Sequence, residues 1–233
     1  MDWLETARRA ASLKAIGYIQ HGHVIGLGSG STVALAVEEL VKKIKEKNMM
    51  ITVIPTSYQS ELLAIEKGLR LAELNRNIKV DVAIDGADQV QIGTLNMIKG
   101  GGGALTREKI VDSAAEKLVI MIDERKLTDR LGRNQPVPLE ILLFWFNATM
   151  EKIRKLGGKP AFREGVGKLG PVVSDNGNFI VDVNFGEIQN PEVLNRDLKL
   201  IPGVVETGLF TGLGGYICVG KRDGTVEVLE GNK

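Results

Sequence analysis

The ten residues from Lys99 to Glu108, KGGGGALTRE, combine a cation, four consecutive glycines and a carboxylate in one short segment. Glycine loses more backbone freedom on folding than any other residue and adds no side chain to a core. Four glycines in a row therefore indicate that a ligand approaches this backbone closely. Lys99 and Glu108, at the two ends of the run, are candidates for acid–base chemistry on an anionic substrate.

Two more carboxylates, Asp85 and Asp88, follow the apolar run from Val80 to Ile84, which has the pattern of a buried strand. Helix capping or turn formation are the alternative roles for these acids. A magnesium site is disfavoured, because such sites usually recruit further carboxylates or a nucleotide phosphate and because Lys99 would compete for the acids. We therefore predict an acid–base site with no metal.

The turn after the predicted strand at 23–27 contains Ser29, Gly30, Ser31 and Thr32 at the start of an amphipathic helix. Backbone N–H groups and the positive end of a helix dipole attract phosphate at such a position. The turn lacks the third glycine of a dinucleotide fingerprint and the lysine of a Walker A loop, which favours a monophosphate over a nucleotide. The alternative is a tight strand-to-helix turn capped by serine or threonine. Lys126, beyond the apolar run 117–123, is either a phosphate partner or a surface charge.

Strands and helices alternate through the first half of the chain. The apolar patterns predict strands at 23–27, 51–57, 71–74, 80–85 and 117–123, and helices at 3–19, 33–47, 60–69 and from Leu105 onward. This alternation predicts an α/β fold with a mostly parallel sheet covered on both faces. In such sheets ligands bind beyond the carboxyl ends of the strands, where the three motifs fall.

A second, smaller module is predicted to begin at Gly132–Pro138, where the sequence RNQPVP interrupts regular structure. A helix over 141–156, strands flanking the turn at 175–178 and a helix over 191–200 indicate an α+β unit of the split βαβ kind. The strands near 215–220 and 225–230 could complete either module. We assign residues 1–131 and 207–233 to the first domain and residues 132–206 to the second.

Composition excludes several classes of partner. The 233 residues include 30 Lys and Arg against 29 Asp and Glu, so no global charge attracts nucleic acid or an anionic membrane. No apolar stretch approaches the roughly 20 residues of a membrane span, and the first residues lack the apolar core of a secretory signal. The single cysteine, Cys218, suits a reducing compartment and has the setting of a buried strand residue. We expect a cytoplasmic protein with a small-molecule substrate.

Seven segments in order resemble the ribose-5-phosphate isomerases of type A: GLGSGSTV, DGADQV, KGGGGALTREKI, IDERK, LGGKP, DNGN and IPGVVETGLF. The resemblance covers nearly the whole chain. It implies a Rossmann-like domain, a smaller ferredoxin-like domain, and a homodimer or homotetramer. It also implies interconversion of ribose 5-phosphate and ribulose 5-phosphate, in the pentose phosphate pathway, with no cofactor.

The resemblance also implies roles for individual residues. The general base of the family matches Glu108, its acidic loop matches Asp85, Gly86, Ala87 and Asp88, and its glycine loop begins at Lys99. We predict that Lys99 stabilises the enediolate oxygen. The substrate-binding positions match Ser29, Gly30, Ser31, Thr32, Gly100, Gly101, Gly102 and Lys126. Many relatives have a phosphate-holding lysine in the first helix, where this chain has Arg8 and Arg9.

Two alternative hypotheses about the function remain. A sugar-phosphate deaminase or coenzyme A transferase would share glycine-rich strand ends, but a transferase also needs its own glutamate motif and a nucleotide pocket, and neither is found. A regulatory domain that senses a sugar phosphate without turning it over would carry a DNA-binding helix pair. Two observations argue against a regulatory domain: the fold pattern begins within the first two dozen residues, and the pair of Lys99 and Glu108 favours catalysis.

Overall fold

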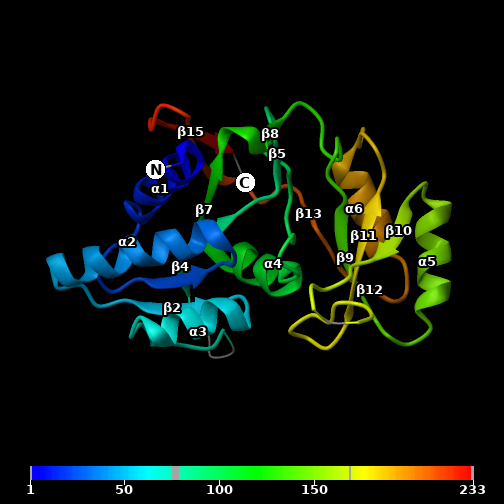
Figure 1. The fold of residues 1–233 in the computed structure, drawn as a ribbon, viewed down its shortest axis with the longest axis horizontal. Coiled ribbons are helices and arrows are strands. Elements are labelled where there is room, and N and C mark those ends of the chain that lie inside the picture. Colours follow the sequence, from blue (N-terminus) through cyan, green and yellow to red (C-terminus); the bar gives the residue numbers. More distant parts are fainter. Residues whose placement is uncertain (1, 75–78, 168, 232–233) are drawn as a thin grey trace. The chain divides into compact units, whose positions relative to one another are not determined.

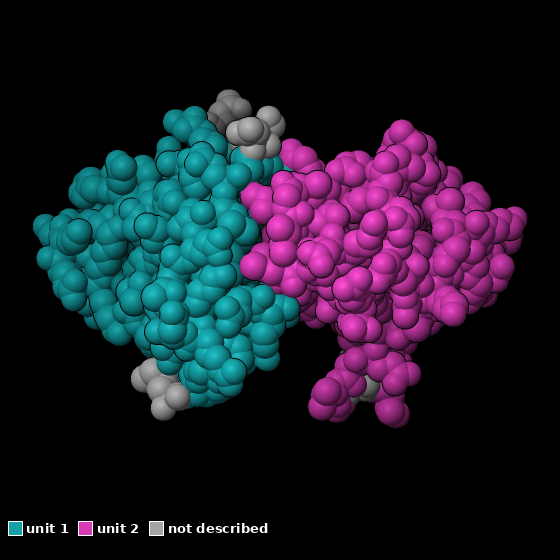
Figure 2. Space-filling view, turned by 90° about the horizontal axis from the view of Figure 1, so that it is seen from above, with its two compact units in different colours: residues 1–87, 107–126, 213–233 teal, residues 88–106, 127–212 magenta. Residues whose placement is uncertain are grey.

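The computed structural model describes residues 2–74, 79–167 and 169–231. The chain forms two compact units (Figure 2). The first comprises Met1–Ala87, Arg107–Lys126 and Leu213–Lys233, and the second comprises Asp88–Thr106 and Leu127–Gly212. The predicted domain boundaries stay a prediction, and their ends at residues 1, 232 and 233 lie outside the described residues.

A seven-stranded sheet forms the centre of the first unit (Figure 1). Its order is β15-β14-β7-β4-β1-β2-β3. The strands are β1 (Val24–Leu27), β2 (Thr52–Pro55), β3 (Arg70–Leu71), β4 (Val80–Gly86), β7 (Ala115–Asp123), β14 (Gly215–Gly220) and β15 (Val226–Gly231). Every neighbouring pair is parallel except β14 with β15. The predicted mostly parallel sheet is confirmed.

Four helices belong to this α/β pattern: α1 (Trp3–Ile16), α2 (Ser31–Lys47), α3 (Tyr58–Glu66) and α4 (Leu105–Ala114). Side chains alternate across a strand, and β1 shows which helices cover each face. Ile25 and Leu27 share a buried core with Ala11 of α1 and Ala36 of α2. Gly26, between them, turns toward Val111 of α4, where an added Cβ would lie 2.4 Å from a valine methyl. The sheet is therefore covered on both faces, as predicted.

The second unit contains the element order βαββαβ. Its elements are β9 (Val137–Ile141), α5 (Phe146–Lys155), β10 (Lys159–Phe162), β11 (Phe179–Asn184), α6 (Pro191–Lys199) and β12 (Val204–Thr207). The strands pair antiparallel in the order β10-β11-β9-β12. Leucine, isoleucine and valine side chains from the sheet and both helices form its core. The predicted smaller α+β unit of the ferredoxin-like kind is confirmed.

A third, small sheet also lies in the second unit. It has the order β13-β6-β5-β8, with strands β5 (Gln89–Gln91), β6 (Met97–Ile98), β8 (Leu127–Thr128) and β13 (Leu209–Phe210). A short 3₁₀ helix, η1 (Glu124–Lys126), precedes β8. This sheet was not predicted, because strands of two or three residues have no measurable periodicity.

Three local predictions are corrected. The helix expected from Ile141 begins at Phe146, because Ile141 ends β9 and an irregular loop follows it. The strand expected before the turn at 175–178 is reduced to an isolated bridge between Val173 and Phe179. The first helix was predicted to extend to residue 19 and ends at Ile16.

None of the helices in the described ranges has the length and hydrophobicity of a membrane-spanning segment.

Candidate active site

The turn between β1 and α2 presents the start of a long helix. Gly30 adopts φ 97°, a conformation that favours glycine, and its carbonyl oxygen accepts the N–H of Ala34. The Gly30 N–H donates to Oε1 of Gln59 over 2.8 Å. Ser31 and Thr32 are the first two residues of the helix. The hydroxyl groups and the helix dipole together make this end of α2 suited to an anion.

Ser29 links the carboxyl ends of three strands. Its hydroxyl group lies 3.0 Å from Thr56 Oγ1 and donates to Ser57 Oγ over 2.7 Å, both directly after β2. Its N–H donates to Asp85 Oδ1, at the end of β4, over 3.2 Å. Thr56 and Ser57 were not among the predicted site residues. Their position directly after the apolar residues of a strand was the available signal.

Asp85 is a buried carboxylate with fixed geometry. Its Oδ1 accepts the N–H of Gly86 over 2.7 Å in addition to that of Ser29. An added Cβ at Gly28 would lie 2.0 Å from both Cγ and Oδ1 of Asp85. The turn between β1 and α2 therefore needs glycine at this position so that the carboxylate can pack against its backbone.

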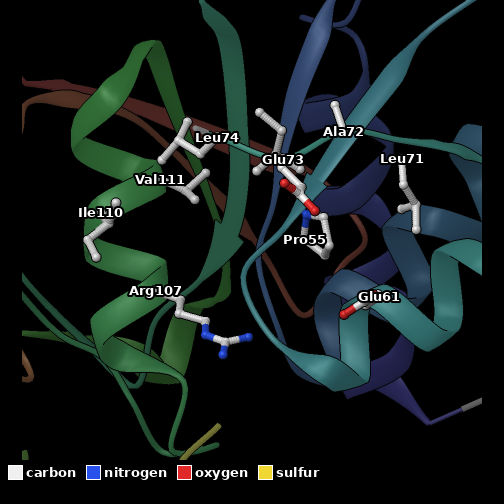
Figure 3. A pocket seen from close by; sticks show the side chains of 10 residues that line it. Pro55, Glu61, Leu71, Ala72, Glu73, Leu74, Arg107, Ile110 and Val111 are labelled. Carbon is white, nitrogen blue, oxygen red and sulfur yellow. The ribbon is translucent and has the colours of Figure 1, made fainter. Parts of the chain in front are cut away.

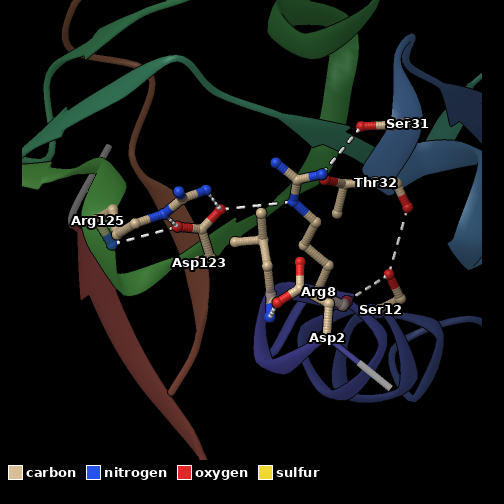
Figure 4. Close-up of polar contacts among 8 residues, drawn as sticks. Asp2, Arg8, Ser12, Ser31, Thr32, Asp123 and Arg125 are labelled. Carbon is tan, nitrogen blue, oxygen red and sulfur yellow. Dashed lines mark hydrogen bonds and ion pairs between the residues drawn. The ribbon is translucent and has the colours of Figure 1, made fainter. Parts of the chain in front are cut away.

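Arg8 joins α1 to the start of α2 (Figure 4). Its Nη1 lies 3.5 Å from Ser31 Oγ, and its Nε lies 3.5 Å from Asp123 Oδ2. Arg125 also binds Asp123, with Nε donating to Oδ1 over 2.8 Å. Burial alone would raise the pKa of Asp123, but the guanidinium groups of Arg125 and Arg8 hold this pKa below its usual value.

The two arginines of α1 have different surroundings. Arg9 forms an ion pair with Glu39 of α2 and lies 3.5 Å from Glu5 and Glu38. Arg8 therefore lies at the predicted phosphate turn, whereas Arg9 belongs to a cluster of carboxylates. Lys126, predicted as a further phosphate partner, is the last residue of η1.

The glycine segment belongs to the second unit and is held by its neighbours. Asp88 Oδ2 accepts the N–H of Gly101 over 2.7 Å. Lys99 is buried, its backbone N–H donates to the Gly208 carbonyl oxygen over 2.9 Å, and its Nζ lies 5.2 Å from the centre of the Phe210 ring. Asp88 and Lys99 therefore approach the same loop, because Lys99 is followed directly by Gly100 and Gly101.

Glu108 lies in the first turn of α4 and is buried. A carboxylate is favoured at this end of a helix because the dipole is positive there. Glu108 and Asp85 belong to the first unit, and Lys99 and Asp88 belong to the second.

A cavity of about 500 Å³ opens beside α4 (Figure 3). Arg107, Ile110 and Val111 line one side, and Ile54 and Pro55 from β2 line another. The Arg107 guanidinium lies 5.0 Å from the centre of the Tyr58 ring. None of the predicted site residues is among the described residues that line this cavity.

Within the described part of the chain, no cluster of three or more His, Cys, Asp or Glu side chains has a metal-binding arrangement. The fold and the strand-end groups define an α/β protein that presents a serine-rich helix start and buried carboxylates at the carboxyl ends of a Rossmann-like sheet. In open α/β sheets, ligands bind beyond this edge of the sheet.

Comparisons with known proteins define the family. The family model described as ribose 5-phosphate isomerase A (phosphoriboisomerase A) matches residues 52–224. The chain is 46% identical to ribose-5-phosphate isomerase A of Methanosarcina acetivorans, over 97% of this chain and 95% of that protein. The solved ribose 5-phosphate isomerase A of Methanocaldococcus jannaschii superposes with a TM-score of 0.93 at 39% identity, over 97% of this chain and 99% of that one.

A second solved structure, a D-ribose-5-phosphate isomerase in complex with phospho-erythronic acid, also has a TM-score of 0.93. It is 41% identical, over 97% of this chain and 99% of that one. The chain belongs to the ribose 5-phosphate isomerase A family.

Proposed function

We propose that this chain is an aldose–ketose isomerase that interconverts D-ribose 5-phosphate and D-ribulose 5-phosphate through an enediolate, in the non-oxidative pentose phosphate pathway and without a cofactor. The observation that carries this proposal is the 46% identity, over 97% of the chain, to ribose-5-phosphate isomerase A of Methanosarcina acetivorans. Buried Lys99 and Glu108 within one ten-residue segment support it independently.

The reaction moves one proton between neighbouring carbons. In the open-chain aldose, Glu108 removes the proton from C2, and the electrons move toward the carbonyl oxygen on C1 to give the enediolate. The Lys99 ammonium stabilises the negative oxygen, and its buried position strengthens this interaction. Glu108 then returns the proton to C1 while the proton on O2 moves to O1, which leaves a ketone at C2 and a hydroxyl group on C1. The same carboxylate therefore acts first as base and then as acid.

Asp85 and Asp88 open the furanose ring and move protons between O1 and O2. Backbone N–H groups fix each carboxylate: those of Ser29 and Gly86 bind Asp85, and that of Gly101 binds Asp88. Fixed carboxylates suit these proton transfers because the substrate oxygens must meet them at hydrogen-bond distance. We assign ring opening and proton transfer between the oxygens to Asp85 and Asp88 together.

The phosphate of the substrate binds at the start of α2, where Ser29, Gly30, Ser31 and Thr32 surround the helix end. Arg8 adds a positive charge within 3.5 Å of Ser31 Oγ. A relative of 41% identity was solved with phospho-erythronic acid, whose phosphate and planar carboxylate match the two ends of a phosphorylated enediolate. Binding of the phosphate positions C2 against the base.

One kinetic comparison tests the phosphate site. Arg8→Ala should raise KM for ribose 5-phosphate more than it lowers kcat, because the charge is used in both ground and transition states. Arg9→Ala is the matched control, since Arg9 pairs with Glu39 on the same helix pair. Equal KM values for Arg8→Ala and the wild type would remove Arg8 from the phosphate site.

A turnover assay distinguishes the isomerase from a sugar-phosphate sensor and from a deaminase. Incubation with ribose 5-phosphate should yield ribulose 5-phosphate at equilibrium, and ribose without phosphate should react far more slowly. Binding of ribose 5-phosphate without ketose formation would favour a sensor. Release of ammonia from an amino sugar phosphate would favour a deaminase.

We also propose that the chain forms a homodimer or homotetramer. Four consecutive apolar residues, 142–145, are exposed between β9 and α5, with Phe144 at 83% and Trp145 at 71%. Trp145 has φ 50°, a strained value for a bulky residue. These two aromatic side chains expose roughly 300 Å² in each copy of the chain. When two copies bury them together with Leu142 and Leu143, the total buried area approaches the ~1,200 Å² of a stable interface.

Sedimentation velocity tests the assembly. The wild type should sediment as a dimer or tetramer, and Phe144→Glu should shift the distribution toward a smaller species. A monomeric wild type would refute the proposed assembly.

We also propose that the protein is cytoplasmic, because its single cysteine is a buried free thiol, which suits a reducing compartment.

A further inference from the structure

Within the second unit, the segment Lys99–Thr106 is held near both of its ends, and the first attachment is made by Glu140. Glu140 is the fourth of the five residues of β9, which pairs with β11 on one side and β12 on the other, and it is fully buried. It accepts hydrogen bonds from Thr106 Oγ1 at 2.5 Å, Ser174 Oγ at 2.8 Å, Asn178 Nδ2 at 2.7 Å and Asn176 Nδ2 at 3.1 Å. Four neutral donors therefore surround one buried carboxylate.

A buried carboxylate of this kind favours a single geometry. Burial of a charge is costly unless hydrogen bonds replace its hydration, and hydrogen bonds to an ionised acceptor are shorter and stronger than neutral ones. Three of the donors come from the turn 174–178, and the fourth comes from Thr106. Glu140 therefore fixes Thr106 against a rigid turn and a central strand.

Thr106 is the second residue of α4, and Glu108 follows two positions later in the same first turn. Because the rise of an α-helix is about 1.5 Å per residue, the backbone of Glu108 lies only about 3 Å further along the axis. A displacement of Thr106 consequently moves the proposed base with it.

The second attachment is made by Arg163, directly after β10. Its Nη1 donates to the carbonyl oxygens of Gly100 and Gly101, each over 2.9 Å. Its Nε and Nη2 donate to Asp182 of β11 over 2.8 Å and 2.5 Å, so the guanidinium plane is fixed from behind. Gly100 has φ 98°, and the loop that follows Lys99 is therefore held in a conformation that other residues rarely adopt.

We propose that Glu140 and Arg163 are positioning residues of the isomerase reaction: Glu140 sets the position of Glu108 through Thr106, and Arg163 sets the position of Lys99 through the glycine loop. The inference rests on the proposed function. Neither residue touches the substrate, and each acts through the backbone of the catalytic segment.

Thr106→Val is the sharpest test, because it removes the hydroxyl group while keeping the shape of the side chain. We expect kcat to fall at least tenfold with KM changed less than threefold, and Thr106→Ser to restore kcat. We also expect a larger deuterium isotope effect with ribose 5-phosphate labelled at C2, because a displaced base slows the C–H step. Thr149→Val is the matched control, since that buried hydroxyl group binds the Pro202 carbonyl oxygen elsewhere in the same unit.

Arg163→Lys tests the second attachment, because lysine keeps the charge but lacks the planar fork that bridges Asp182 to two carbonyl groups. We expect the same pattern of lower kcat with little change in KM. Arg133→Lys, at an exposed ion pair with Glu187, is its control. Thermal unfolding of all variants shows whether the enzyme remains folded.

Two results would overturn the inference. One is wild-type kcat in both Thr106→Val and Arg163→Lys. The other is a loss of kcat that matches the loss of folded protein, with an unchanged isotope effect. Absence of isomerase activity in the wild type would instead refute the proposed function, so the two failures are distinguishable.

Discussion

Substitution of Gly28 by alanine tests whether the fixed position of Asp85 matters for turnover. The new Cβ would lie 2.0 Å from Asp85 Oδ1 and 2.6 Å from its Cβ, so rotation of the carboxylate alone does not relieve the contact. The side chain must move by about 1.4 Å to reach an ordinary van der Waals distance. This movement breaks the hydrogen bonds from Ser29 and Gly86.

A displacement of about 1 Å at a reacting group can reduce the rate roughly 100-fold. We therefore expect Gly28→Ala to lower kcat/KM for ribose 5-phosphate by about two orders of magnitude, measured as ketose formation per folded molecule. Gly158→Ala is the control, because its Cβ would meet Val183 at 2.6 Å and Phe185 at 2.8 Å in the second unit. Both variants should lose thermal stability, but only Gly28→Ala should lose activity per folded molecule. Wild-type kcat/KM in folded Gly28→Ala would refute the role of Asp85.

Further outcomes follow from the same geometry. Ser31→Ala should raise KM more than it lowers kcat, and the reverse pattern would remove the start of α2 from the phosphate site. A chelator should leave kcat unchanged, because Lys99 supplies the positive charge, and strict dependence on added metal would contradict this. Burial raises the pKa of Cys218 to about 11, so alkylation at pH 8 should be at least about 100-fold slower in the native protein than for an ordinary thiol. Because this pKa is higher in the folded state than in the unfolded state, the Cys218 thiol contributes fully to stability below about pH 9, and this contribution is lost as the pH rises toward about 11. Urea unfolding of the wild type and Cys218→Ala across this pH range measures the change in the free energy of unfolding.

The main elements of the fold could be predicted because their patterns are local. The apolar runs that form β1, β4 and β7 are continuous, as expected for strands covered on both faces. The element order βαββαβ in the second unit was partly visible from its helices and the turn at 175–178. The helix expected from Ile141 was wrong at its start, because the apolar residues 141–145 continue the strand pattern into an exposed loop, and only tertiary structure separates strand from loop there.

The candidate site was predictable only where chemistry is concentrated in the sequence. Lys99, Asp85 and Asp88 lie within two positions of a glycine, and Glu108 follows the glycine run by five positions; glycines mark close approach of the backbone. Arg163 and Glu140 have no glycine directly beside them, and their partners lie 19 to 63 positions away in the chain. Thr56 and Ser57 were missed although they directly follow a strand, since a threonine and serine pair is common in ordinary turns. Distant hydrogen bonds of this kind require the structure.

Proton exchange at carbon tests the central claim, that Glu108 transfers the proton between C2 and C1, most directly. In deuterated water, the wild type should exchange this proton with solvent during interconversion. Glu108→Gln should slow the exchange by on the order of 10²–10⁴-fold, while the Kd for ribose 5-phosphate changes only a few-fold. Exchange at the wild-type rate in folded Glu108→Gln would contradict the account.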